Sequence, residues 1–272
     1  MGKVTFRKSF DRSSCRLFLF LFLIQTLHGR DSQIDEQLRV LNNDFIDADV
    51  VFQLQETTRT ESEEWFNITS GSTQETAMKT SLRMGDNPLT LNIYTVGNVV
   101  ASGNSVLGYA TFPDEYQPNP ALDGVVLLYT TFPGGSNAPF NEGHTLTHEV
   151  GHWVGLYHTF QGGCNGGIWV GDYASDTSPQ ASATIGCPTT NPDTCPGEGV
   201  DRKSTFRCSP SGSVAHSLSF PAIHNYMDYT DDSCMNNFSV GQCSRLRWQI
   251  EIYRIENLPR YGFPPPPPRF KH

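Results

Sequence analysis

The segment HEVGHWVGLYH, from His148 to His158, constrains this chain more than any other feature. If the segment begins as a helix, His148 and His152 lie one turn apart on one face, so both imidazoles can reach a single metal ion. Glu149 then lies close to the open side of that metal. Gly155 lets the helix end in a sharp turn, because glycine tolerates positive φ. That turn brings His158 round as a third ligand, and the spacing predicts a three-histidine metal centre.

Three protein ligands leave one position open for water, which is typical of a catalytic rather than a structural zinc site. Zinc lowers the pKa of such a water to roughly 7 and polarises a scissile carbonyl. Glu149 is the predicted general base, which takes the proton and later delivers it to the leaving amine. The pattern predicts a zinc endopeptidase; a metal-binding but inactive relative is the alternative, and the intact Glu149 disfavours it.

The composition limits the partners. The chain has 272 residues with 19 Lys+Arg and 28 Asp+Glu, a formal charge of -9. An acidic balance argues against binding to nucleic acid or to an anionic membrane, because both need clustered basic residues. No run of 18 apolar residues is present to span a bilayer. We expect protein or peptide substrates, no nucleic acid, no membrane and a monomer.

The N-terminus carries a targeting pattern. Basic residues precede the short apolar run at 17–24, which is typical of a secretory signal and predicts a secreted, extracellular protein. The alternative is a buried helix. The end of this segment, Leu27-His28-Gly29-Arg30, is not a small-x-small cleavage site, so the cut after 1–28 stays uncertain. We expect no room for a prodomain between this segment and the first predicted helix.

One catalytic domain is expected over 29–257, followed by a disordered tail at 258–272 that contains five consecutive prolines. Ser32 is the expected N-cap of the first helix. The run at 124–131 is continuously apolar, as in a strand covered on both faces. Periodicity predicts helices at 33–47, 145–155 and 239–257, and strands at 50–55, 89–96, 106–112 and 124–131.

A second element, NYMDY at 225–229, supports the zinc motif. The motif and this methionine together resemble the metzincin clan, in which a methionine turn lies beneath the metal. Further segments narrow the resemblance: HTFQGGC from 158, GDYASDT from 171, GCP from 186, DTC from 193 and HNYMDYTDDSCM from 224. Over about residues 33–254 the chain resembles the pappalysin family, and most of all its branch of secreted fungal extracellular metalloproteases.

The resemblance implies an α+β zincin-like fold, with a twisted mixed sheet and helices over an irregular C-terminal subdomain stapled by disulfides. The cleft lies between the two parts. The strand at 106–112 is the candidate edge strand for pairing with substrate. The resemblance assigns the zinc ligands to His148, His152 and His158 and the general base to Glu149. It makes Met227 the methionine of the turn and Tyr229 a tyrosine that can donate to the oxyanion.

Three further oxygen-bearing residues gain roles from the resemblance. Asp232 matches an acid on the floor of the S1′ pocket, which in relatives goes with cleavage before Arg or Lys; the alternative is a solvated turn aspartate. Asp172 and Thr177 match a calcium loop, and their oxygens suit calcium. An Asx-turn is the alternative for that pair.

The number of cysteines is consistent with a secreted protein. Cys15 lies in the signal, and the six that remain are an even number, which indicates disulfides in a secreted chain. The resemblance pairs Cys187 with Cys234 and Cys164 with Cys195, and leaves Cys208 and Cys243 as a candidate pair. Two sequons, at Asn67 and Asn237, are candidate glycan sites.

The segment 199–220 departs from the family pattern, as an inserted loop or a retained intron. It motivates an alternative function, a secreted zinc-binding protein with an impaired site that acts as a binding or decoy module. Another reaction of a zinc-activated water, such as deamination, is disfavoured by the methionine turn.

Overall fold

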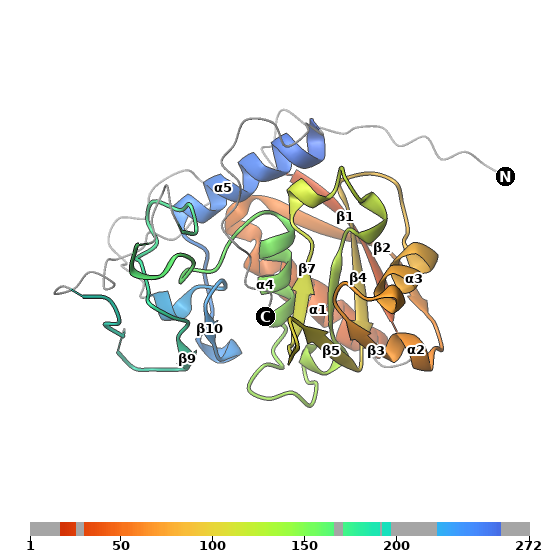
Figure 1. Cartoon of the computed structure of the whole chain (residues 1–272), viewed down its shortest axis with the longest axis horizontal. Helices are drawn as coiled ribbons and strands as arrows, with labels where there is room; N and C mark the ends of the chain where they lie inside the picture. The colour runs from red at the N-terminus through yellow and green to blue at the C-terminus, as the bar shows by residue number, and fades with distance from the viewer. Residues whose placement is uncertain (1–16, 26–29, 166–170, 191, 197–221, 257–272) are drawn as a thin grey trace.

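A five-stranded sheet forms one half of the molecule (Figure 1). The computed structural model describes residues 17–25, 30–165, 171–190, 192–196 and 222–256. The strand order is β2-β1-β4-β8-β7; the first four strands are parallel, and β7 is antiparallel to β8 at one edge. The strands are β1 (Leu17–Gln25), β2 (Val50–Arg59), β4 (Thr90–Val96), β7 (Gly108–Ala110) and β8 (Val125–Leu128).

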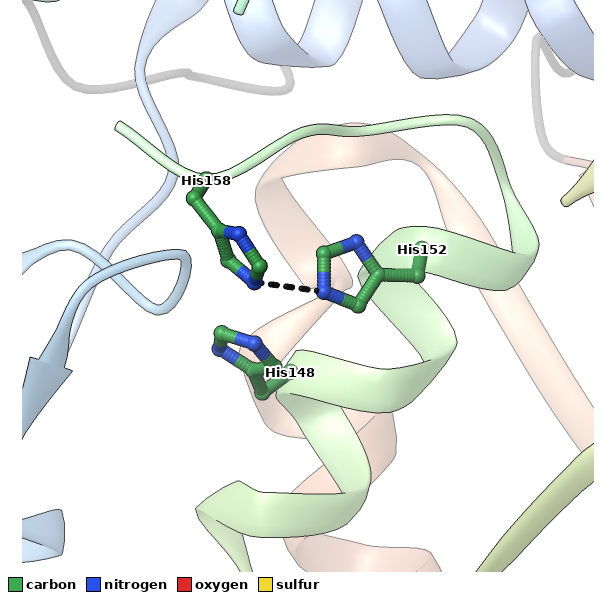
Figure 2. Close-up of side chains that lie close together, drawn as sticks. All are labelled: His148, His152 and His158. Carbon is green, nitrogen blue, oxygen red and sulfur yellow. Dashed lines mark hydrogen bonds between the residues drawn. The ribbon is translucent and has the colours of Figure 1, made fainter. Parts of the chain in front are cut away.

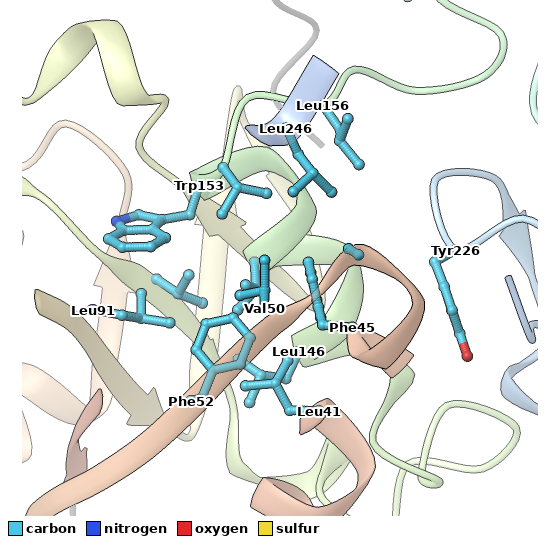
Figure 3. Close-up of a cluster of buried hydrophobic side chains, with 14 of the residues drawn as sticks. Leu41, Phe45, Val50, Phe52, Leu91, Leu146, Trp153, Leu156, Tyr226 and Leu246 are labelled. Atoms are coloured by element: carbon cyan, nitrogen blue, oxygen red, sulfur yellow. The ribbon is translucent and has the colours of Figure 1, made fainter. Parts of the chain in front are cut away.

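Two helices, α1 (Asp31–Asp44) and α4 (His144–Trp153), cover one face of this sheet. Leu91 of β4 belongs to the same hydrophobic cluster as Leu41 of α1 and Leu146 of α4 (Figure 3). The other face carries a second cluster, which includes Tyr94 and Val126. All seven residues of β4 are buried, and both faces of β8 are covered, as its continuous apolar run predicts.

Short elements complete the first half. A three-stranded sheet has the order β3-β5-β6. Met78, from the third helix, packs into the second hydrophobic cluster. These elements are α2 (Glu63–Phe66), β3 (Asn67–Thr69), α3 (Thr73–Leu82), β5 (Asn98–Ala101) and β6 (Asn104–Ser105).

The second half is largely irregular and lies on the other side of α4 from the sheet (Figure 1). It contains the two-residue strands β9 (Ile185–Gly186) and β10 (Tyr229–Thr230), which pair in parallel. The helix α5 (Val240–Ile250) continues as a π-helical segment (Glu251–Ile255). Both disulfides implied by the resemblance are present, Cys164–Cys195 and Cys187–Cys234. The α+β architecture with a stapled C-terminal subdomain is confirmed.

The helix predicted at 33–47 is present as α1, but it spans Asp31–Asp44 and has Arg30 as N-cap, not Ser32. The Gln33 side chain accepts the Arg30 backbone N–H at 3.2 Å and satisfies one of the donors at this helix end. The strand at 124–131 is shorter than predicted, because Tyr129–Thr131 turns into a 3₁₀ helix. The insertion at 199–220, the tail at 258–272, and Cys15 and Cys208 lie outside the described residues.

The apolar run near the N-terminus is the strand β1, which differs from the buried helix considered as the alternative. Leu21 pairs with Leu54 of β2 on one side and with Leu91 of β4 on the other. The interpretation of 1–28 as a secretory signal stays a prediction, and it competes with this pairing, because cleavage there would remove a strand from the interior of the sheet. Within the described part of the chain, no helix has both the length and the apolar character needed to cross a membrane.

A buried ion pair joins the C-terminal helical segment to Asp123, which precedes β8, and both groups contact Trp153 at the end of α4. Arg254 Nη1 lies 3.1 Å from Asp123 Oδ2, and both residues are 1% exposed. Trp153 Nε1 donates to the same carboxylate at 3.1 Å, and the Arg254 guanidinium lies 3.5 Å from the centre of the indole ring. Arg254 also donates to the backbone oxygen of Trp153 at 3.0 Å. Either charge would be left uncompensated in the core if the other were removed.

We therefore expect Arg254→Ala to lower the free energy of unfolding by about 3–5 kcal/mol, because it strands the buried Asp123 carboxylate. Arg247→Ala is the matched control: its partner Asp49 lies at 2.7 Å, but the Arg247 side chain is 44% exposed. That variant should lose about 1 kcal/mol or less. Urea unfolding of both variants measures the difference, and equal losses would contradict the role assigned to Arg254.

Candidate metal centre and cleft

Three buried histidines converge as the sequence predicts (Figure 2). One candidate ligand atom from each of His148, His152 and His158 lies within 4.8 Å of the other two. The Nε2 atoms of His152 and His158 are 2.9 Å apart. The first two histidines project from α4, and the third comes from the loop that follows it.

The return of this loop depends on a glycine. Gly155 has φ of +99°, and a Cβ at this position would meet Cγ of Gln249 on α5 at 2.6 Å. Only glycine combines that backbone conformation with so close a neighbour. Farther along, the Thr159 backbone N–H donates to the Met227 oxygen at 3.1 Å, which holds the loop that carries His158 against the methionine turn.

Backbone carbonyls fix the tautomers of two histidines. His148 Nδ1 lies 2.7 Å from the Tyr226 oxygen, and His152 Nδ1 lies 2.8 Å from the Leu156 oxygen. A carbonyl only accepts, so each Nδ1 must carry the proton and each Nε2 offers a lone pair. Burial lowers the pKa of His148 to about 4, opposed by its bond to Tyr226, and keeps the ring in the neutral form that ligates metals. The donor set therefore fits zinc.

Glu149 is the carboxylate of this centre. It is 3% exposed, and its Oε2 has no hydrogen-bond partner among the described residues. Burial raises the pKa of Glu149 to about 8, and a divalent cation beside it would lower that pKa again by charge attraction. Gly108 of β7 makes room for this side chain, since a Cβ there would lie 3.1 Å from Glu149 Cγ. A buried carboxylate oxygen of this kind is suited to hold a water.

The methionine turn lies directly against α4. Met227 is fully buried, and a Cβ on Gly151 would lie 2.4 Å from its sulfur. Tyr229 follows two residues later, with its hydroxyl 3.4 Å from His158 Nε2. The structure thus brings both predicted residues to the three histidines.

A cavity of about 340 Å³ on one side of Glu149 contains Asp232 and is also lined by His148 and Gly108. Asp232 is 1% exposed, and its Oδ2 accepts the Glu142 backbone N–H at 2.8 Å. Burial raises the pKa of its carboxyl, opposed mainly by that hydrogen bond. The alternative of a solvated turn aspartate is therefore wrong. β7 forms the edge of the sheet beside this cavity, as expected, although it spans only Gly108–Ala110 of the predicted 106–112; its pairing with substrate stays a prediction.

Asp172 and Thr177 are also brought together. One carboxylate oxygen of Asp172 accepts the Thr177 hydroxyl, and the other accepts the Ala174 backbone N–H at 3.1 Å. Burial raises the pKa of Asp172 to about 7, opposed mainly by the bond from Thr177. The bond to Ala174 is that of the Asx-turn considered as the alternative. Calcium binding by this pair stays a prediction.

The two sequons differ in accessibility. Asn67 is exposed at the start of β3 and stays a candidate glycan site. Asn237 is 3% exposed, and its side chain donates to the His224 oxygen at 3.3 Å. A glycan on Asn237 does not fit this packing, so that candidate is corrected. The Asn-x-Ser/Thr sequence alone does not indicate whether its asparagine is buried or exposed.

Asp44 of α1 is a contributor that sequence reasoning missed. Its carboxylate accepts the Thr147 hydroxyl of α4 at 2.6 Å and the Tyr226 hydroxyl at 2.8 Å. The Asp44 carboxylate therefore links α1, α4 and the segment that contains Tyr226, whose backbone oxygen orients His148. An aspartate at the end of a helical pattern gives no sign of such contacts.

We expect Gly151→Ala to lower the free energy of unfolding by about 1–3 kcal/mol, because its methyl group overlaps the Met227 sulfur. Helix propensity alone predicts the opposite, a gain of about 1 kcal/mol. In a Met227→Ala background the same substitution should be neutral or stabilising. Chemical denaturation of the four proteins in this cycle gives the coupling, and stabilisation by Gly151→Ala alone would contradict it.

Comparisons with known proteins agree with this geometry. The family model for pregnancy-associated plasma protein-A, Peptidase M43, matches residues 76–251. Extracellular metalloprotease 1 of Coccidioides posadasii is 43% identical over 219 residues, which cover 79% of this chain and 67% of the relative. An extracellular metalloprotease of Verticillium alfalfae is 43% identical over 229 residues, 82% of this chain and 69% of the relative.

A solved structure is similar over nearly the whole chain. Mature mirolysin of Tannerella forsythia, in complex with a cleaved peptide, has a TM-score of 0.64 and 29% sequence identity. The match covers 89% of this chain and 98% of that one. Family model, relatives and structure agree with the three-histidine centre, and the chain therefore belongs to the pappalysin family of metzincins and is a metalloprotease.

Proposed function

We propose that this metalloprotease cleaves peptide bonds of extracellular proteins, with zinc held by His148, His152 and His158 and with Glu149 as general base. The observation that carries the proposal is the convergence of the three imidazoles beside a buried carboxylate. Zinc, when bound, supplies a Lewis acid for the substrate carbonyl and acidifies a water.

The protein's own groups supply the proton transfers and the alignment. Glu149 Oε2 accepts a proton from a water in the cleft and returns it to the nitrogen of the leaving amine. The edge strand β7 aligns an extended substrate through main-chain hydrogen bonds. The Tyr229 hydroxyl, near His158, is placed to donate to the oxyanion after a small side-chain movement.

Glu149→Gln should keep the shape and the bound zinc but lose the proton acceptor. We expect kcat to fall by about 10²- to 10⁴-fold with zinc still at one per chain. His152→Ala, or a chelator, should remove the metal together with the activity. Casein hydrolysis and elemental analysis on the same samples distinguish these outcomes, and a Gln variant with the wild-type rate would reject Glu149 as the base.

We also propose that the Asp232 cavity receives an Arg or Lys side chain that follows the cleaved bond. A buried carboxylate with one backbone donor can accept further charged hydrogen bonds, and a cation there would favour its ionised form. The neighbouring His144 donates through Nδ1 to the Asp232 backbone oxygen at 2.9 Å, which leaves the carboxylate itself for the substrate.

Asp232→Asn should reduce kcat/KM for peptides with Arg after the cut by about 10- to 100-fold, because one charged hydrogen bond is worth roughly 1.5–3 kcal/mol. Peptides with Leu there should change little. Asp231→Asn is the matched control, because Asp231 is the adjacent acid and does not line this cavity. An unchanged Arg-to-Leu ratio in the Asp232 variant would count against this pocket assignment.

We propose that the protein is secreted. Its relatives carry the name extracellular metalloprotease, and two disulfides suit an oxidising compartment. We propose further that it acts as a monomer on protein or peptide substrates.

A further inference from the structure

A second cavity of about 340 Å³ lies on the other side of Glu149. The Asp232 cavity reaches the start of β7 and His148, whereas this one reaches the end of β7, His152 and His158. The two cavities therefore follow one another along the edge strand, with Glu149 lining both. The function proposed above does not use the second cavity.

We propose that this second cavity binds a large apolar side chain of the substrate, Phe or Leu in class, upstream of the cleaved bond. The inference rests on the proposed function: if the residue after the cut occupies the Asp232 cavity, the residues before it run past the second one. Side chains of an extended peptide alternate between two faces, so the cavity selects among alternate upstream residues.

One part of the cavity wall is aromatic and aliphatic, beside polar residues such as Asn119 and Gln161. Phe112 stacks on Tyr157, with ring centroids 5.0 Å apart and an angle of 28° between the rings. Phe112 also lies 5.3 Å from the His152 ring, so this wall continues up to the metal centre. Leu122 and the exposed Pro118 also line the cavity. An apolar side chain that enters from β7 would exchange water for these carbon surfaces.

Besides Glu149, two acids line the cavity, Glu75 and Glu115, and both make internal contacts. Glu75 lies 2.8 Å from the Nζ of Lys79, which is itself fully buried and donates to the Leu122 oxygen at 2.9 Å. Glu115 accepts the Phe112 backbone N–H at 2.9 Å. None of the described residues that line the cavity is Lys or Arg, whereas Glu75, Glu115 and Glu149 all line it. An acidic substrate side chain would therefore meet three carboxylates and no Lys or Arg, whereas an apolar one meets the aromatic wall.

Peptides with Arg fixed after the cut and either Phe, Leu, Ala or Glu at each of four upstream positions test the proposal. We expect at least one upstream position at which Phe exceeds Ala by about 10- to 100-fold in kcat/KM, with Glu the poorest. In Phe112→Ala this ratio should collapse toward one, while the preference for Arg after the cut persists.

Two further variants guard against indirect effects, because Phe112 touches the His152 ring. Leu122→Ala, on a different part of the wall, should also lower the Phe-to-Ala ratio, at an unchanged zinc content. Ile46→Ala is the control, since Ile46 is 50% exposed and lines neither cavity. It should leave every ratio unchanged.

The outcomes separate this proposal from the one it rests on. Cleavage before Arg without any upstream preference, or ratios unaffected by both wall variants, would overturn the upstream cavity alone. No cleavage of any peptide by the zinc-loaded protein would overturn the proposed function and this inference together.

Discussion

Helix α4 packs against the sheet on one side and faces the C-terminal half on the other, and the rest of the structure depends on these two contacts. Leu146, Val150 and Trp153 pack toward the sheet, while His148 and His152 face the C-terminal half. Nine of its ten residues are buried. The histidine side chains are therefore held by packing on both sides, and the carbonyls of Tyr226 and Leu156 orient two of the rings.

Two buried carboxylates connect the elements around this helix. Asp44 joins α1 to α4 and to the Tyr226 segment, and Asp123 pairs with Arg254, which also contacts Trp153. Burying charge contributes little net stability even when it is paired, because desolvation offsets the attraction. These contacts fix the positions of the elements relative to one another, because a shift of one residue along an element would leave a buried charge without its partner.

Much of the centre could be predicted from the sequence, because histidines one helical turn apart are a periodic pattern with a specific geometric meaning. The two disulfides and the buried position of Asp232 followed from resemblance rather than from spacing. Strands β3, β5 and β6 could not be found, since two to four residues carry no detectable periodicity. The Arg254–Asp123 pair was equally hidden, because charged residues ordinarily indicate surface. For 17–25 the pattern is ambiguous: a continuous apolar run is typical both of a secretory signal and of an interior parallel strand.

The place of β1 in the sheet bears on how the chain folds. Leu21 precedes both of its partners, Leu54 and Leu91, which lie on strands that follow in turn along the chain. Non-local parallel pairing is slow, because closing the intervening loops costs entropy before any contact compensates for it. The pairing of β1 with β4 therefore belongs to the slower part of folding, and until it forms, an apolar strand carries one unpaired edge, which favours aggregation.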